Sequence, residues 1–183
     1  MVWESKNFEE KMNPYIDEIY KNIFSELIEI KRSNREKTVD SKILFMDKEL
    51  AIDTFLYFKD GSILTLQEKT RKINYLDYDD FTFEYFNDPI TKDKGEWFKL
   101  AAQLYFYGYA NQSEDGYIKY YLIIIPKLRI FLEEIGIETL TRKYLRQNKP
   151  PAKANFFAVP FRLIPKNCIY IEKGELNDTR NGM

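Results

Sequence analysis

The chain has 183 residues, of which 44% are hydrophobic and 31% charged, with a formal net charge of -1 and no histidine. This composition is typical of a folded protein rather than a disordered tail, and the length predicts a single domain over residues 1-183. The lack of histidine excludes Ser-His-Asp and Cys-His catalysis, histidine-based zinc hydrolysis and any nuclease that uses a histidine base.

Cysteine content and the N-terminal sequence indicate the compartment. Cys168 is the only cysteine, which excludes an intramolecular disulfide and a thiolate zinc cluster and fits a reducing environment. The first residues include Glu4, Glu9 and Glu10, where a signal peptide would need an apolar stretch. No apolar run reaches the roughly 18 residues of a membrane span. The sequence therefore predicts a cytoplasmic protein with no membrane partner.

The first half of the chain predicts one helix and a meander of three strands. The helix begins at Asn13-Pro14, with Asn as the cap and Pro at the first helical position, and its apolar spacing continues to Ile30. A polar loop follows over 33–39. The three predicted strands cover 42–46, 50–58 and 62–69, with turns at 47–49 and 59–61.

The second half alternates predicted strands and helices and ends in a tail. The expected fold class is α/β, a central mixed sheet flanked by helices, with a core over about 14-172 and a frayed tail over 174-183. The predicted elements are strands at 81–86, 117–125, 154–164 and 168–172 and helices at 96–110 and 127–140.

The hairpin over 50–69 carries the polar residues that point to chemistry. Two registers are open: a two-residue turn would pair Asp53 with Glu68, and a three-residue loop with a bulge at its glycine would pair Asp53 with Gln67. In the second register Asp53, Gln67 and Lys69 share one face. That register is favoured, because a slip by one residue would mix the polar and apolar sets. The opposite face would then carry Ile52, Leu56, Phe58, Leu64 and Leu66.

An Asp at position 53, thirteen intervening residues and then Gln67-Glu68-Lys69 resemble the Asp…(Asp/Glu)-x-Lys signature of the PD-(D/E)XK superfamily of restriction-type nucleases. The predicted order of a helix, a meander bearing the triad, a helix and a further strand, over about 14–125, resembles the core of that family. The chain departs from the family pattern at Gln67, where an acidic residue is common. Glutamine is an accepted variant there, but it leaves one negative charge fewer for a second metal.

The resemblance implies a restriction-endonuclease-like fold and hydrolysis of DNA phosphodiester bonds by a magnesium-activated water. Asp53, Gln67 and the main-chain carbonyl of Glu68 would hold Mg²⁺, with Mn²⁺ as a substitute, since both prefer oxygen ligands. Lys69 would orient the water and contact the scissile phosphate.

An acidic residue outside the hairpin is expected to complete the site. Glu26, at the border of the predicted helix's apolar stripe, is the favoured candidate, to bind the water shell of the metal. Glu18 fits the helical phase less well, and Glu84 would come from the next strand.

The charge distribution suggests where nucleic acid would bind. Seven acidic residues lie between Asp77 and Glu96, whereas residues 139–166 contain no acidic residue at all. The predicted phosphate contacts, to DNA or to RNA, are Arg142, Lys143, Arg146, Lys149 and Lys153.

Two other readings stay open. A nuclease-fold protein whose glutamine has weakened the metal site would bind nucleic acid or protein without cleaving it. An unrelated α+β interaction protein would leave Asp53 and Lys69 pointing into solvent. The resemblance also leaves room for a homodimer or a larger assembly.

Overall fold

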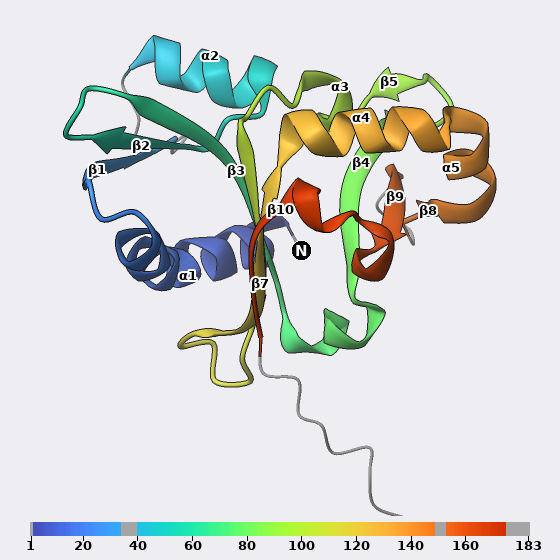
Figure 1. Ribbon diagram of the computed structural model, residues 1–183. Helices are drawn as coiled ribbons and strands as arrows, with labels where there is room; N and C mark the ends of the chain where they lie inside the picture. Colours follow the sequence, from blue (N-terminus) through green and yellow to red (C-terminus); the bar gives the residue numbers. More distant parts are fainter. Residues whose placement is uncertain (1, 34–39, 149–152, 175–183) are drawn as a thin grey trace, which may run out of the picture.

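The computed structural model describes residues 2–33, 40–148 and 153–174, with side chains from residue 7 onward (Figure 1). It is an α/β structure with a mixed central sheet flanked by helices, as the sequence predicts. No helix in these ranges is long and apolar enough to cross a membrane. The elements are α1 (Val2–Ile23), β1 (Leu27–Arg32), α2 (Ser41–Leu50), β2 (Thr54–Phe58), β3 (Ile63–Arg71), η1 (Ile73–Tyr78), β4 (Asp80–Asp88), β5 (Asp93–Lys94), α3 (Glu96–Lys99), β6 (Leu104–Ala110), β7 (Tyr117–Ile124), α4 (Ile125–Ile135), α5 (Ile137–Tyr144), β8 (Leu145–Gln147), β9 (Asn155–Pro160), η2 (Phe161–Leu163), η3 (Lys166–Cys168) and β10 (Ile169–Gly174).

The larger sheet has six strands in the order β1-β2-β3-β6-β7-β10. β1, β2 and β3 form an antiparallel meander, and β6 then lies parallel to β3. The pairs of β2 with β3 end at Leu66, whereas the pairs of β6 with β3 run from Leu66 to Arg71. The part of β3 that carries Gln67 and Lys69 therefore lies at the open end of the hairpin, beside β6.

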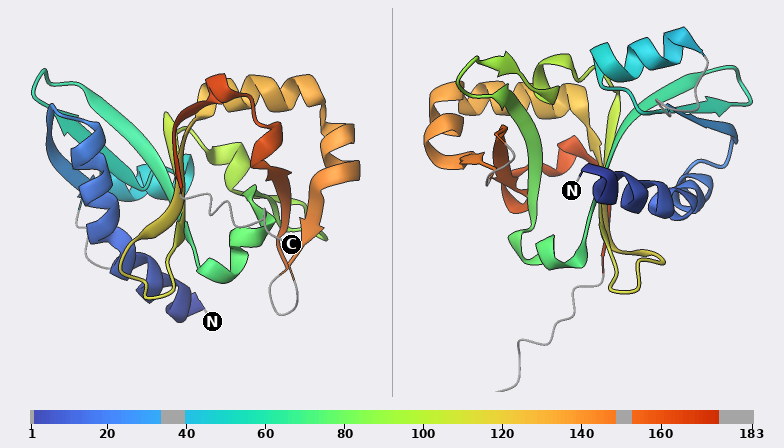
Figure 2. Two further views of the ribbon diagram at one scale, coloured as in Figure 1. Left: turned by 60° about the horizontal axis from the view of Figure 1, so that its bottom comes forward. Right: turned by 180° about the vertical axis from the view of Figure 1, so that it is seen from behind.

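The smaller sheet, in the order β5-β4-β9-β8, stands beside the larger one (Figure 2). Two side chains of the larger sheet donate hydrogen bonds to the backbone of β4. The Tyr109 hydroxyl donates to the Asp80 carbonyl at 3.2 Å, and Lys69 Nζ to the Thr82 carbonyl at 3.4 Å. These bonds satisfy β4 carbonyls and join the two sheets directly.

Each face of the larger sheet packs against a hydrophobic cluster. On one face α1 packs Ile16 and Tyr20 against the sheet residues Leu56, Leu66 and Phe106. On the other face a larger cluster joins the sheet to α2, α4, α5 and the smaller sheet. Its fully buried aromatic members are Phe81, Phe83, Tyr105, Tyr107, Tyr109, Tyr121 and Phe157.

The first helix differs from the prediction at both ends. α1 begins at Val2, contains Pro14 within it and ends at Ile23. An internal proline removes one backbone hydrogen bond and costs about 3 kcal/mol or more. Burial of Met12 and Ile16 on either side of it offsets that cost. The apolar spacing beyond Ile23 belongs to strand β1, in which Ile30 pairs with Leu56.

The predicted strand over 42–46 is wrong, because this segment lies in helix α2. Asp40 caps the helix by accepting hydrogen bonds from the backbone N–H groups of Lys42 and Ile43. Ile43, Met46 and Leu50 pack on the larger cluster, and their spacing is helical. The predicted turn at 47–49 lies inside this helix, and β2 begins only at Thr54.

The predicted helix over 96–110 is also wrong. Only Glu96–Lys99 is helical, and Leu104–Ala110 forms β6, which is buried along its whole length. The predicted helix over 127–140 is two helices that meet at Gly136, where φ is +80°. The predicted strands at 62–69, 81–86, 117–125 and 168–172 are confirmed with small changes at their ends, as β3, β4, β7 and β10. The predicted strand over 154–164 is shorter, because β9 ends at Pro160 and the 3₁₀ helix η2 follows it. Residues 175–183 of the predicted tail lie outside the described residues.

Candidate active site

The register of the β2–β3 hairpin is the one in which Asp53 and Gln67 lie opposite each other. Thr54 pairs with Leu66, which places Asp53, the preceding residue, beside Gln67. The loop has three residues and ends at Gly61, whose φ of +83° suits glycine. The prediction of the three-residue loop is confirmed, and with it the placement of the polar triad on one face.

The hairpin separates polar and apolar side chains as expected, with one exception. Leu56, Phe58, Leu64 and Leu66 all pack in the cluster under α1. Ile52 packs in the opposite cluster, because it lies before β2 in the link from α2, where its N–H bonds to the Met46 carbonyl at 3.2 Å.

Asp53 is a partly buried carboxyl with one backbone hydrogen-bond donor. Its Oδ2 accepts a hydrogen bond from the N–H of Glu68 at 3.2 Å. Burial raises the pKa of Asp53 well above its usual value, and the nearby charges of Glu68, Glu96 and Asp47 raise it further. A cation bound to this carboxyl would stabilise its ionised form and lower its pKa.

Gln67 presents an acceptor that the protein does not use. Its Oε1 is buried and has no hydrogen-bond partner in the structure. A buried acceptor without a donor costs about 1–3 kcal/mol, so its presence calls for a ligand, a cation or a water.

Lys69 follows on the same face and is held by β4 through the bond to the Thr82 carbonyl. Burial lowers the pKa of its ammonium, and Arg71 lowers it further, whereas the carboxylates of Glu96, Glu84 and Glu9 raise it. The amine is therefore easier to deprotonate than that of an ordinary lysine.

Asp53 and Gln67 line the same pocket, of about 420 Å³, between the end of the hairpin, α2, β4 and α3. Lys69 is close enough for its charge to interact with two acidic residues of that pocket, Glu84 and Glu96. The lining residues are Asp47, Lys48, Ala51, Asp53, Gln67, Glu84, Asn87, Glu96 and Lys99. The pocket thus combines four carboxyl groups with two lysines and the unpaired amide oxygen.

Glu96 and Asp47 are the two acidic residues of this pocket that the sequence analysis did not name as site candidates, and Glu96 is the one whose charge acts on Lys69. Glu96 begins α3, and its Oε1 accepts a hydrogen bond from the Tyr105 hydroxyl at 3.0 Å. Burial raises the pKa of Glu96, and Lys69 and the Tyr105 hydroxyl oppose that rise. Arg129 fixes α3 by donating to the carbonyls of Trp97 and Leu100 at 2.8 and 2.6 Å. The missed signal is a carboxylate directly after a glycine at a predicted helix start.

The acidic residues expected from the first helix are placed differently. α1 ends before Glu26, which therefore lies in the turn to β1, where its carboxylate pairs with Lys59 at 3.2 Å beside the hairpin loop. Glu26 is exposed and does not line the pocket of Asp53, and Glu18 lines a different one. The acid of α1 whose charge interacts with Lys69 and Glu96 is Glu9. Glu84, the third candidate, does line the pocket.

Glu68 turns its side chain to the opposite face of the sheet. Its carboxylate accepts hydrogen bonds from Tyr20 at 2.8 Å and from Arg32 Nε at 2.8 Å. Arg32 also bonds to Asp17. This network anchors β3 to α1 and β1, and it leaves only the backbone of Glu68 available on the side of Asp53.

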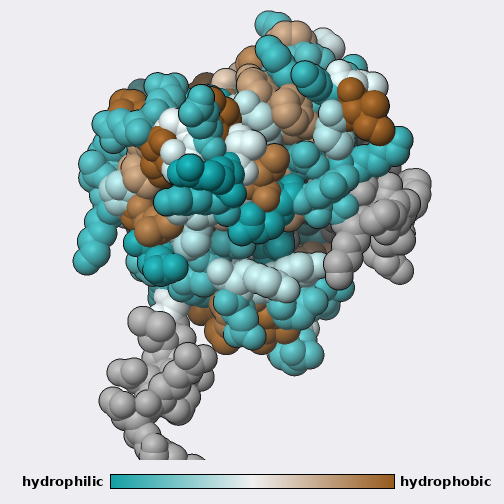
Figure 3. All heavy atoms as spheres, turned by 90° about the vertical axis from the view of Figure 1, so that its right-hand side faces the viewer, coloured by the Kyte–Doolittle hydropathy of each residue, from teal (hydrophilic) through white to brown (hydrophobic). Residues whose placement is uncertain are grey.

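The predicted phosphate contacts lie on the far side of the smaller sheet. Arg142 and Lys143 are exposed in the last turn of α5, and Arg146 is exposed on β8. Lys153 pairs with Asp88 at 3.7 Å, and Lys149 lies outside the described residues. Seen from this side, the surface is largely hydrophilic, with hydrophobic residues in separate groups (Figure 3).

Among residues 2–33, 40–148 and 153–174, no three Cys, Asp or Glu side chains gather so that they could hold a metal ion. The donor set implied by the resemblance is of another kind, with one carboxylate, one amide oxygen and one main-chain carbonyl. No protein-family model and no curated protein matches the sequence, and no solved structure matches the fold.

Proposed function

We propose that this chain is a metal-dependent nuclease of the PD-(D/E)XK type, which hydrolyses DNA phosphodiester bonds at the pocket of Asp53 and Gln67. The observation that carries the proposal is the buried, unpaired Oε1 of Gln67 directly across the hairpin from Asp53. An orphaned acceptor beside a carboxyl of raised pKa is what a cation site without its cation would leave.

The order of the sheet strands supports the same proposal. A helix, three antiparallel strands and a further strand, here α1, β1-β2-β3 and β6, match part of the order described above, with α2 inserted between β1 and β2. The connection from β3 to β6 runs through η1, β4, β5 and α3 in place of a long helix. The resemblance to a restriction-endonuclease-like core therefore rests on the sheet and the triad.

The residues present fit Mg²⁺ or Mn²⁺. Asp53, Gln67 Oε1 and the Glu68 carbonyl are oxygen donors, the kind that both ions prefer, and the pocket has room for the waters that Mg²⁺ keeps. When bound, the metal would lower the pKa of a water and neutralise charge on the phosphate.

The protein's own groups divide the remaining work. Lys69 orients the attacking water and, as an ammonium, contacts the phosphate and stabilises the charge that develops on it. Glu96, held by Tyr105, and Glu84 keep Lys69 in place through their charges. Arg142, Lys143 and Arg146 bind the DNA backbone farther from the reacting phosphate.

The proposal predicts that Asp53→Ala and Lys69→Ala fail in different ways. Asp53→Ala removes the charged ligand, so both Mn²⁺ binding and cleavage should fall by orders of magnitude. Lys69→Ala keeps the ligands and removes a cation that repels the metal. Metal binding should then persist or tighten, while cleavage in Mg²⁺ is lost. Mn²⁺ titration by calorimetry and cleavage of several DNA forms measure the two effects.

Glu26→Gln is the matched control, since it changes a carboxylate that contacts the hairpin loop at Lys59 and lies outside the pocket. It should leave metal binding and cleavage as in the wild type. Equal cleavage by wild type and Lys69→Ala would overturn the mechanism. A wild type that binds DNA, holds no divalent ion and cleaves nothing would favour the alternative function, a nuclease-fold binding module, for which the missing charge at Gln67 is the argument.

A further inference from the structure

Two tyrosines on η1 present their rings to solvent at the end of the strand that carries Lys69. Residues three apart on a 3₁₀ helix lie one above the other, so Tyr75 and Tyr78 share a face. Their ring centroids are 6.3 Å apart, and the two residues are 40% and 67% exposed. The tyrosines of β6, by contrast, are buried.

Side-chain contacts connect this aromatic pair with Lys69 of the candidate active site. Arg71 lies two residues after Lys69 on the same face of β3, a distance of about 7 Å along the strand. Its guanidinium stacks on the ring of Tyr75, with Cζ 4.2 Å from the centroid, and donates a hydrogen bond to Thr82 Oγ1 at 3.1 Å. Lys69 bonds to the carbonyl of the same threonine. A chain of side-chain contacts through Thr82 therefore links Lys69, Arg71 and Tyr75.

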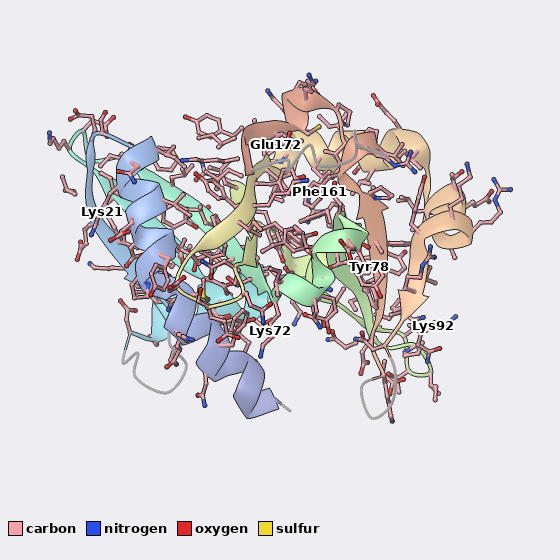
Figure 4. All side chains as sticks on the ribbon, turned by 90° about the horizontal axis from the view of Figure 1, so that it is seen from below. Lys21, Lys72, Tyr78, Lys92, Phe161 and Glu172 are labelled. Carbon is pink, nitrogen blue, oxygen red and sulfur yellow. The ribbon has the colours of Figure 1, made fainter. Side chains whose placement is uncertain are left out.

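The charges along this path suit a phosphate backbone. Arg71 has a buried Nε without a hydrogen-bond partner. Lys72 is exposed beside it, with its ammonium 3.6 Å from the Glu114 carboxylate and 5.1 Å from the centroid of the Phe8 ring. Asp79, at the end of η1, is paired with Lys119 at 2.8 Å, which offsets its charge, whereas Asp77 stays exposed. Seen from below, Lys72 lies between α1 and η1, and Tyr78 lies on the side of η1 away from α1 (Figure 4).

We propose that Tyr75 and Tyr78 stack the unpaired bases of single-stranded DNA, while Arg71 and Lys72 hold its phosphates. Bases inside a duplex have both faces covered by their neighbours, so only an unpaired base can stack on a side chain. The inference rests on the proposed nuclease function and names its substrate: a single strand, or a single-stranded extension of a duplex, that leads from η1 to the pocket of Asp53.

The test measures binding of a fluorescent twelve-nucleotide thymidine strand and of a duplex of equal length, in EDTA so that no metal-dependent cleavage occurs. Wild type should prefer the single strand. Tyr75→Ala and Tyr78→Ala should each weaken its binding about tenfold, the scale of one lost base stack, and leave duplex binding unchanged. Tyr78→Phe keeps the ring and should bind as the wild type does. Tyr170→Ala removes another exposed tyrosine, on β10, and should have no effect.

Each outcome is decisive for one of the two proposals. No preference of the wild type for the single strand, or equal binding by Tyr78→Ala and Tyr170→Ala, overturns the stacking inference even when the protein cleaves DNA in Mg²⁺. If the wild type binds the single strand through its tyrosines but cleaves no DNA, the stacking inference is supported and the proposed nuclease function is wrong. A circular-dichroism spectrum like that of the wild type shows that each variant is folded.

Discussion

The carboxyl of Asp53 receives one backbone hydrogen bond and is otherwise placed where ionisation is unfavourable. An unfolded aspartate has a pKa of about 3.9, and burial raises the pKa of Asp53 above that value in the folded chain. Between these two pKa values the folded state binds more protons than the unfolded state. The free energy of unfolding therefore falls as the pH rises through that window.

Asp53→Asn removes this pH-dependent decrease in the free energy of unfolding, so it should stabilise the metal-free protein at neutral pH. Each kcal/mol recovered raises the melting temperature by about 2–4 °C in a protein of this size. Thermal unfolding in EDTA from pH 4 to pH 8 should show a gap between variant and wild type that widens with pH. Asp60→Asn is the control, because hydrogen bonds from Ser62 lower the pKa of Asp60, so it should show no such gain. A constant gap would mean that Asp53 ionises freely.

The sequence was a good guide to this residue and a poor one to its neighbours. The placement of Asp53 beside Gln67 follows from hydrophobic alternation and a glycine-ended loop, which are local properties. A glycine followed by a carboxylate marks the start of α3, but Glu96 reaches the same pocket through the packing of α3 against β4 and Arg129, which are tertiary contacts. Glu26 was misplaced because the spacing of Leu27 and Ile30 is helical, whereas in the structure a β-bulge between Leu27 and Glu29 places both side chains on one face of β1.

At the level of elements, the errors fall where tertiary contacts override local patterns. The segment Leu104–Ala110 has apolar residues at spacings that a helix also accepts, yet it forms a strand, because β3 and β7 pair with it on both sides. Its tyrosines are rich in β propensity, which was the available signal. In α2 the signal was the cap at Asp40, three residues before Ile43, the first of the apolar residues at helical spacing.

The close contact between β4 and the start of α3 should be sensitive to one added carbon. A Cβ at Gly95 would lie 2.6 Å from the Glu84 carbonyl oxygen, a backbone atom that moves only with the strand. Gly95→Ala should thus push α3 from β4, lower the melting temperature and reduce metal binding and cleavage, because Glu84 and Glu96 flank the contact. A Cβ at Gly116 meets only Asn111 Nδ2 at 3.5 Å, so Gly116→Ala should be tolerated. Equal effects of both substitutions would contradict this account.

On the scale of the whole molecule, one hydrophobic cluster joins both sheets and fixes the pocket between them. The cluster includes Phe55 of the hairpin, Tyr105 of the larger sheet and Phe157 of the smaller one. The basic segment belongs to the outer part of the smaller sheet and its helix α5, away from the clustered acids around the pocket. Burial raises the pKa of Asp80, and the charges of Arg71, Arg146 and Lys69 are close enough to oppose that rise.

This charge distribution predicts that α5 and the outer part of the smaller sheet bind the phosphate backbone of DNA at a distance from the pocket. Arg142 and Lys143 are exposed at the end of α5, whereas Lys153 already pairs with Asp88. Each phosphate contact adds slightly less than one unit to the slope of log K against log salt concentration. The double variant Arg142→Ala/Lys143→Ala should therefore flatten that slope by about two units.

The measurement is DNA affinity at several salt concentrations, in EDTA, for the wild type and two double variants of equal charge. Lys21→Ala/Lys42→Ala is the control, since both lysines are exposed on other elements, Lys21 near the end of α1 and Lys42 in α2. If charge alone governed binding, both double variants would flatten the slope equally. If only Arg142→Ala/Lys143→Ala flattens the slope, these two residues of α5 contact phosphates. If the slope is unchanged in that variant, α5 is not part of the DNA-binding surface.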